Sequence, residues 1–168
     1  MKKRTNLARS AAVVFSMTLI SSACYATWSD LGTGPNTSTP TLTDATCNRT
    51  QSNRWTGGDL TITSTGVAKS STGNGLAATD YPVGTLTNSG LIETTRTSAS
   101  AVAFYISQDI TLIDNAGTIT NINAYGGSGI SNTNSASTIT EIRNSGLIYG
   151  ITYGIRNDGA ITSIFNSA

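Results

Sequence analysis

The residues most able to do chemistry are six charged side chains in the second half of the chain. A polysaccharide hydrolase or lyase needs acids and a base gathered on one face, and retaining glycosidases hold two carboxyl groups about 5 Å apart. Asp114 and Arg143 stand at equivalent positions of successive repeats, which predicts neighbouring outward positions and a surface ion pair. We interpret these charges as solvated surface pairs and assign no catalytic residue. The six are Asp109, Asp114, Glu141, Arg143, Arg156 and Asp158.

The composition excludes several kinds of catalytic and metal centre, because the chain contains no histidine. A Ser-His-Asp triad, a Cys-His pair and a His-ligated metal all require that side chain. Gly126-Gly-Ser-Gly129 resembles the start of a calcium-binding nonapeptide, but it lacks the aspartate of that motif and does not recur. The sequence contains no phosphate-binding loop and no Gly-x-Ser-x-Gly elbow. We expect no cofactor and no metal ion.

Four tyrosines form a second group of candidates. An aromatic strip would stack on sugar rings, although tyrosine is also an ordinary strand residue. Lys69 is the one lysine beyond the amino-terminal segment, and the sequence offers it no obvious partner. The tyrosines are Tyr105, Tyr125, Tyr149 and Tyr153.

The elements that must position these residues are indicated by composition. The 168-residue chain is only 11% charged but 38% hydrophobic, so it has enough apolar residues for the core of one domain. Thr, Ser, Gly and Asn dominate the remainder, and Thr, Ile and Val favour strands while Gly and Asn favour turns. This pattern predicts an all-β protein and argues against helical bundles and α/β enzymes.

The amino terminus is typical of a secretory signal peptide. Four basic residues precede the uncharged residues 10–23, a stretch too short to span a bilayer core of ~30 Å. Cleavage after Ala26 is our preferred site, and cleavage after Ala23 also fits the rule of small residues. Lipidation of Cys24 would need a bulky apolar residue three positions earlier, where Ser21 stands.

Export changes the charge and the cysteine count of the chain. Residues 1–26 hold four of the ten basic residues and none of the nine acidic ones, which leaves six against nine and a net charge of −3. A mildly acidic chain without a basic patch does not favour nucleic acid as a partner. Cys47 is alone if cleavage follows Ala26, whereas cleavage after Ala23 would allow a Cys24–Cys47 disulfide. We assign Cys47 no function.

Internal repeats carry most of the information. A motif of two aliphatic residues three apart, then Asn two positions later and, in three of its four copies, Gly two positions after that, occurs at 83–92, 110–119, 139–148 and 161–168. Its asparagines recur at intervals of 27, 29 and 22 residues, so each unit is a fixed motif plus a variable insert. A looser motif lies between the copies: Gly129-Ile130-Ser-Asn132 matches Gly154-Ile155-Arg-Asn157, with weaker counterparts at Gly75-Leu76-Ala77 and Ala101-Val102-Ala103.

Short β-rich units of this kind bury an apolar face only when they stack on one another. A leucine-rich horseshoe is the alternative, but its leucine frame and helical half are missing. We predict a right-handed parallel β-helix of about four to five coils over residues 59–168, after the signal peptide (1–26) and an irregular leader or cap (27–58) in which Trp55 packs over the first turn. The asparagines should stack and hydrogen-bond along a column, at a spacing of ~4.8 Å.

Three columns of aliphatic residues are expected to face the interior. The spacing of three between Ile110 and Ile113 departs from the period of two of a straight strand, which predicts a corner or bulge between them. The columns are Val83/Ile110/Ile139/Ile161, Leu86/Ile113/Ile142/Ile164 and Ile92/Ile119/Ile148.

Repeats such as Leu86-Thr-Asn-Ser-Gly-Leu-Ile92 and Tyr153-Gly-Ile-Arg-Asn-Asp-Gly-Ala-Ile161, behind a signal peptide, resemble the passenger domain of Gram-negative autotransporters. The resemblance covers residues 59–168. It implies export through the inner membrane and a place at the cell surface, on the outer membrane or in the medium. Members of that family carry a C-terminal β-barrel, and this sequence contains no such segment. The resemblance therefore also implies an amino-terminal fragment or a truncated product.

Two functions from different classes follow. The first is an exported, non-catalytic surface scaffold or adhesin-like passenger fragment. Its inserts, such as 94–100 and 121–128, would present the contact surface for a host-surface or polysaccharide ligand. The second is the amino-terminal part of a β-helix enzyme that acts on extracellular polysaccharide. The absence of histidine and the scarcity of lysine favour the first. For either, we expect no direct membrane insertion of this segment, and self-association through an uncapped C-terminal coil.

The mature protein is predicted to begin at Thr27. Export of the full chain in a Gram-negative host followed by intact-mass measurement checks this. A product that starts at Cys24 and carries lipid would contradict it.

Overall fold

The computed structural model describes residues 41–42, 46–49 and 53–167. The expected signal peptide, both cleavage sites and Cys24 lie outside these residues. The described part of the chain is all β, and its strands are parallel to their neighbours throughout. It contains no helix long and apolar enough to cross a bilayer.

The strands form three parallel sheets. The six-stranded sheet has the order β1 (Thr41–Leu42), β3 (Leu60–Ile62), β6 (Val83–Asn88), β9 (Ile110–Asn115), β12 (Thr138–Asn144) and β15 (Ala160–Asn166). The five-stranded sheet consists of β2 (Thr46–Arg49), β4 (Val67–Ser70), β7 (Leu91–Thr94), β10 (Thr118–Asn121) and β13 (Leu147–Tyr149). The four-stranded sheet consists of β5 (Leu76–Ala78), β8 (Val102–Ile106), β11 (Ser128–Asn132) and β14 (Tyr153–Asn157).

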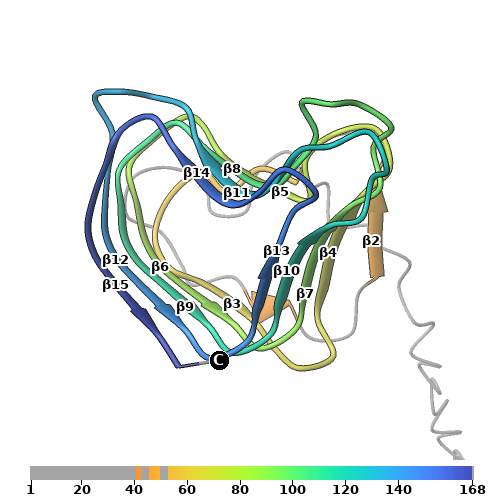
Figure 1. The fold of residues 1–168 in the computed structure, drawn as a ribbon. Helices are drawn as coiled ribbons and strands as arrows, with labels where there is room; N and C mark the ends of the chain where they lie inside the picture. The colour runs from red at the N-terminus through yellow and green to blue at the C-terminus, as the bar shows by residue number, and fades with distance from the viewer. Residues whose placement is uncertain (1–40, 43–45, 50–52, 168) are drawn as a thin grey trace, which may run out of the picture.

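Successive coils lie directly on one another. In Figure 1, which looks along the stack, the chain runs counter-clockwise from β12 through β13 and β14 to β15 as it advances towards the viewer. That is the right-handed sense expected for parallel connections. The structure is thus a parallel β-solenoid of about four turns, which confirms the predicted fold class.

The strand register confirms the three predicted aliphatic columns, although Ile164, in the last coil, is 52% exposed. Ile113, for example, pairs with Leu86 on one side and with Ile142 on the other, and all three are fully buried. Trp55 is also fully buried, with its ring centroid 6.3 Å from that of Phe104. The four-stranded sheet adds a further inward column that the sequence analysis did not single out: Leu76, Phe104, Ile130 and Ile155.

The predicted corner lies inside a continuous strand. In β9 the buried positions are Ile110, Ile113 and Asn115, a spacing of three followed by two. Both isoleucines are on the inner side, so the strand bends between them, and Figure 1 shows β12 and β15 as curved strands along the same wall. The bend lets one strand line two walls of the interior.

Asparagine side chains form a ladder where β6, β9, β12 and β15 end. Asn88 Nδ2 donates to Asn115 Oδ1 at 2.7 Å, Asn115 Nδ2 to Asn144 Oδ1 at 2.7 Å, and Asn144 Nδ2 to Asn166 Oδ1 at 2.8 Å. Asn88 and Asn115 are completely buried. A buried amide needs partners for its donors and acceptors, and here each coil supplies them to the next.

The second motif also forms a ladder, with Asn132 Nδ2 donating to Asn157 Oδ1 at 2.9 Å. One predicted alignment is wrong, however. Ile130 pairs with Phe104, so the counterpart of this motif on β8 begins at Ala103, two residues later than the 101–103 match suggested. On β8, Phe104 stands where β11 has Ile130, and Ile106 stands where β11 has Asn132. Because these residue types differ, the sequence did not indicate the correct register.

Glycine lets the sheets pack closely at two positions of this motif, whereas the equivalent position on β8 holds the buried Ala103. A Cβ atom on Gly129 would lie 2.8 Å from the carbonyl oxygen of Tyr149, where the chain returns from the five-stranded sheet. Gly75, its equivalent two coils earlier, meets the carbonyl of Glu93 in the same way. The residue that makes this motif recognisable is therefore one that lets two sheets approach.

Asn115→Ala should destabilise the solenoid by about 2–3 kcal/mol. The substitution removes the acceptor of Asn88 Nδ2 and the donor to Asn144 Oδ1, so two ladder hydrogen bonds are lost. Urea unfolding of the full chain measures the loss. Asn166→Ala, at the exposed end of the ladder, is the control and should have a much smaller effect. Equal effects would show that the ladder does not hold the interior together.

Candidate functional site

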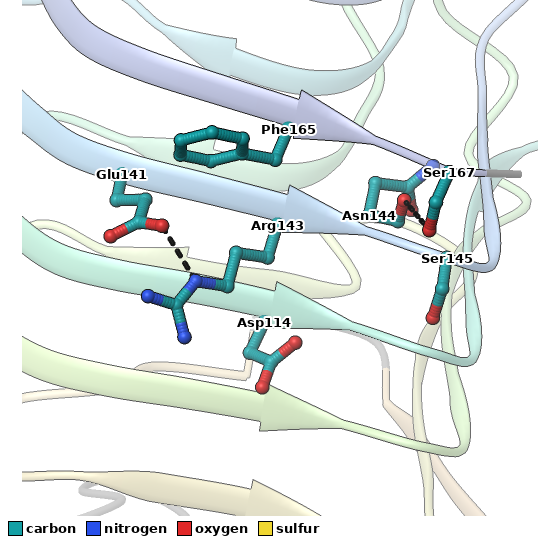
Figure 2. A pocket seen from close by; sticks show the side chains of 7 residues that line it. All are labelled: Asp114, Glu141, Arg143, Asn144, Ser145, Phe165 and Ser167. Atoms are coloured by element: carbon teal, nitrogen blue, oxygen red, sulfur yellow. Dashed lines mark hydrogen bonds and ion pairs between the residues drawn. The ribbon is translucent and has the colours of Figure 1, made fainter.

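The strongest group of charges lies on the outer face of the six-stranded sheet. Asp114, Arg143 and Phe165 are register partners on β9, β12 and β15. Each directly precedes an inward asparagine of the ladder, and side chains alternate along a strand, so each points outward. Figure 2 shows the three side chains lying together above the sheet, with Glu141 beside Arg143.

The predicted adjacency of Asp114 and Arg143 is confirmed, but the ion pair has a different partner. Arg143 Nε donates to Glu141 Oε1 at 2.6 Å, and Glu141 lies two residues earlier on the same face of β12. This hydrogen bond and the charge of Glu141 raise the pKa of Arg143, with a smaller contribution from the charge of Asp114. Arg143 therefore forms its ion pair with Glu141 on the same strand and not with Asp114 in the previous coil.

These residues line a shallow hollow of about 410 Å³, together with Asn144, Ser145, Phe165 and Ser167. Phe165 is 60% exposed and covers one side of it. Retaining glycosidases need two carboxyl groups that both face the sugar, whereas Glu141 is held in an ion pair with Arg143. The hollow therefore has the character of a binding surface with mixed charges.

The remaining charged candidates are distributed around the coil and do not join this group. Asp109 stands just before β9, where its Oδ1 accepts from the backbone N–H of Thr138 at 2.7 Å. Asp59 accepts from the N–H of Thr85 at 2.7 Å in the same manner. Arg156 and Asp158 form their own exposed ion pair at 2.9 Å. Aspartate before a strand thus fastens the following coil, a role that the sequence analysis missed.

Lys69 does have a partner, contrary to the sequence analysis. It is the register neighbour of Glu93 on β7, and their side chains form an ion pair on the outer face of the five-stranded sheet. The Glu93 side chain is only 11% exposed. The two residues are outside the recurrent motif, so the repeat gave no signal that they face each other.

The four tyrosines do not form one strip. Tyr105 and Tyr153 line a single hollow on the outer face of the four-stranded sheet. Tyr149 ends β13 and pairs with Thr120 in the five-stranded sheet. Tyr125 lies in the segment before β11 and is 70% exposed. A corner of the coil separates Tyr149 from Tyr153, although only three residues lie between them.

No group of three or more acidic or cysteine side chains suited to a metal ion occurs in the described residues. Gly126 and Gly127, which the sequence analysis compared with a calcium loop, have φ angles of 108° and 109°. These values belong to the region that favours glycine, so the pair serves to bend the chain into β11.

Comparisons with models of protein families, with curated proteins and with solved structures gave no match for this chain.

The contrast between neighbouring inward and outward residues of β12 gives a direct test. Ile142→Asp places an unpaired carboxylate in the interior and should cost several kcal/mol, about 3 or more, because Ile142 is fully buried. Arg143→Ala removes only an exposed side chain and should leave the urea midpoint nearly unchanged. Similar losses in the two variants would mean that the faces of β12 are wrongly assigned.

Proposed function

We propose that the chain is an exported, non-catalytic scaffold of the adhesin-like kind, part of an autotransporter passenger that acts at the surface of a Gram-negative cell. The observation that carries the proposal is the way the stack holds its inserts in place. A repeated frame with fixed inward residues supports side chains on the outside that are free to vary, which suits a presenting surface.

The insert between β10 and β11 illustrates this. Asn121 Nδ2 donates to the carbonyl of Ala101 at 2.8 Å, and Asn123 Nδ2 donates to the carbonyl of Ser98 at 2.5 Å. Both asparagines are buried, so this insert is fastened to the one in the coil before it. Between and beyond them Ile122 is 54% and Tyr125 70% exposed.

Large apolar side chains on a firmly held loop indicate a contact surface. An ordinary solvent-facing loop would show polar residues at these positions. Here the anchors are polar and inward, and the apolar residues face outward. This arrangement supports adhesion by contact, with a host surface or polysaccharide as the ligand.

The alternative is the amino-terminal part of a β-helix enzyme that acts on extracellular polysaccharide. Asp114 and Glu141, on adjacent strands of one hollow, are the observation in its favour. Their arginine neighbour and the lack of a further base among the described residues of that hollow favour binding.

A retention assay separates the two functions. The full chain is applied to cultured epithelial cells and to polysaccharide-coated wells, and both the bound protein and any released sugar are measured. The double variant Ile122→Ser/Tyr125→Ser should lower retention at least about fivefold, equivalent to ~1 kcal/mol. Tyr81→Ser is the matched control, because Tyr81 is 48% exposed and lies outside the insert.

Retention without release of sugar is the expected result. Release of sugar by the unmodified chain, abolished in Glu141→Gln, would establish the enzyme instead. Retention that falls equally in the control would overturn the role of the insert.

A further inference from the structure

The outer face of the four-stranded sheet forms the floor of a hollow. In Figure 1 the strands β5, β8, β11 and β14 lie at the bottom of an indentation between two sets of loops. Side chains leave a cavity of about 180 Å³ there. It is lined by the sheet itself, by residues 99–101 and 127 of the inserts, and by Thr133 and Thr152.

Strand register explains the shape of this hollow. Two outward columns cross the sheet: Val102, Ser128 and Tyr153 are partners in one, and Tyr105, Ser131 and Arg156 in the other. The middle strand, β11, carries a serine in both. The large side chains stand on the strands to either side, so two aromatic walls flank a low floor. The walls are two strand spacings apart, about 10 Å.

The polar groups of the hollow are oriented and balanced in charge. Thr133 Oγ1 donates to the hydroxyl of Tyr105 at 2.9 Å, which fixes that ring and leaves the phenolic proton available to a ligand. Arg156 Nη2 donates to Asp158 Oδ2 at 2.9 Å, and the pair carries no net charge. A phosphate or sulfate ligand would instead require positive charge without compensation.

We propose that this hollow binds a neutral oligosaccharide chain. Sugar hydroxyls both donate and accept, and they find hydroxyl and guanidinium partners in this hollow. The C–H faces of sugar rings carry partial positive charge and pack on the negative faces of the aromatic rings of Tyr105 and Tyr153. The serine floor lets the chain approach the backbone of β11. This inference deepens the proposed adhesive function and rests on it, because it names the ligand class that an adhesive face would hold.

Native gels cast with dextran, mannan or xylan test the proposal, with heparin as the anionic comparison. At least one neutral polysaccharide should retard the full chain, and Tyr153→Ala should raise the apparent Kd at least about tenfold, or ~1.4 kcal/mol. Tyr149→Ala is the control, because Tyr149 is 43% exposed but lies in the five-stranded sheet. Urea unfolding verifies that both variants are folded.

Several outcomes would overturn the assignment. They are retardation by heparin alone, no retardation by any neutral polysaccharide, and equal loss in the two tyrosine variants. Retention on cells that survives enzymatic removal of surface glycans would indicate a protein partner and also overturn it, while the adhesive function would stand. Retardation by a neutral polysaccharide without retention on cells would support the hollow and contradict the adhesive function.

Discussion

Register between parallel coils is the constraint on which the rest of the structure depends. Backbone hydrogen bonds hold adjacent coils ~4.8 Å apart, so every inward side chain lies directly on its equivalent in the next coil. Residues that pack or hydrogen-bond with copies of themselves satisfy this condition and can recur from coil to coil. Isoleucine does so by shape, and asparagine does so because its amide both donates and accepts.

This constraint also explains which features could be predicted from the sequence. The columns through Ile113 and the ladder through Asn115 were predictable because the same residue recurs at the same place in each coil. The match at β8 was placed two residues too early, because Phe104 and Ile106 differ from their counterparts Ile130 and Asn132. The recurrent positions were sufficient to predict the fold class. The alignment of β8 depended on positions where the residue type varies between coils, and it was therefore wrong.

The candidate sites were harder to predict, since they depend on outward residues. Lys69 and Glu93 meet across two strands that share no motif, and Arg143 takes a partner on its own strand in place of the one in the previous coil. Tyr149 and Tyr153 are close in sequence but lie on different sheets, because the coil turns between them. Outward positions obey no repeat, so their neighbours become known only when the corners of each coil are known.

The asparagine ladder gives the solenoid a direction. Asn88, Asn115 and Asn144 each donate to the amide of the later coil, and the pair Asn132 and Asn157 has the same orientation. The amide dipoles therefore add along the axis, and each polarises the next. A stack of this kind has unlike poles, one that offers carbonyl oxygens and one that offers amide protons. The two ends of the ladder therefore differ: Asn88 Oδ1, at the earlier end, accepts from the backbone N–H of Gly90, whereas Asn166 lies exposed at the later end.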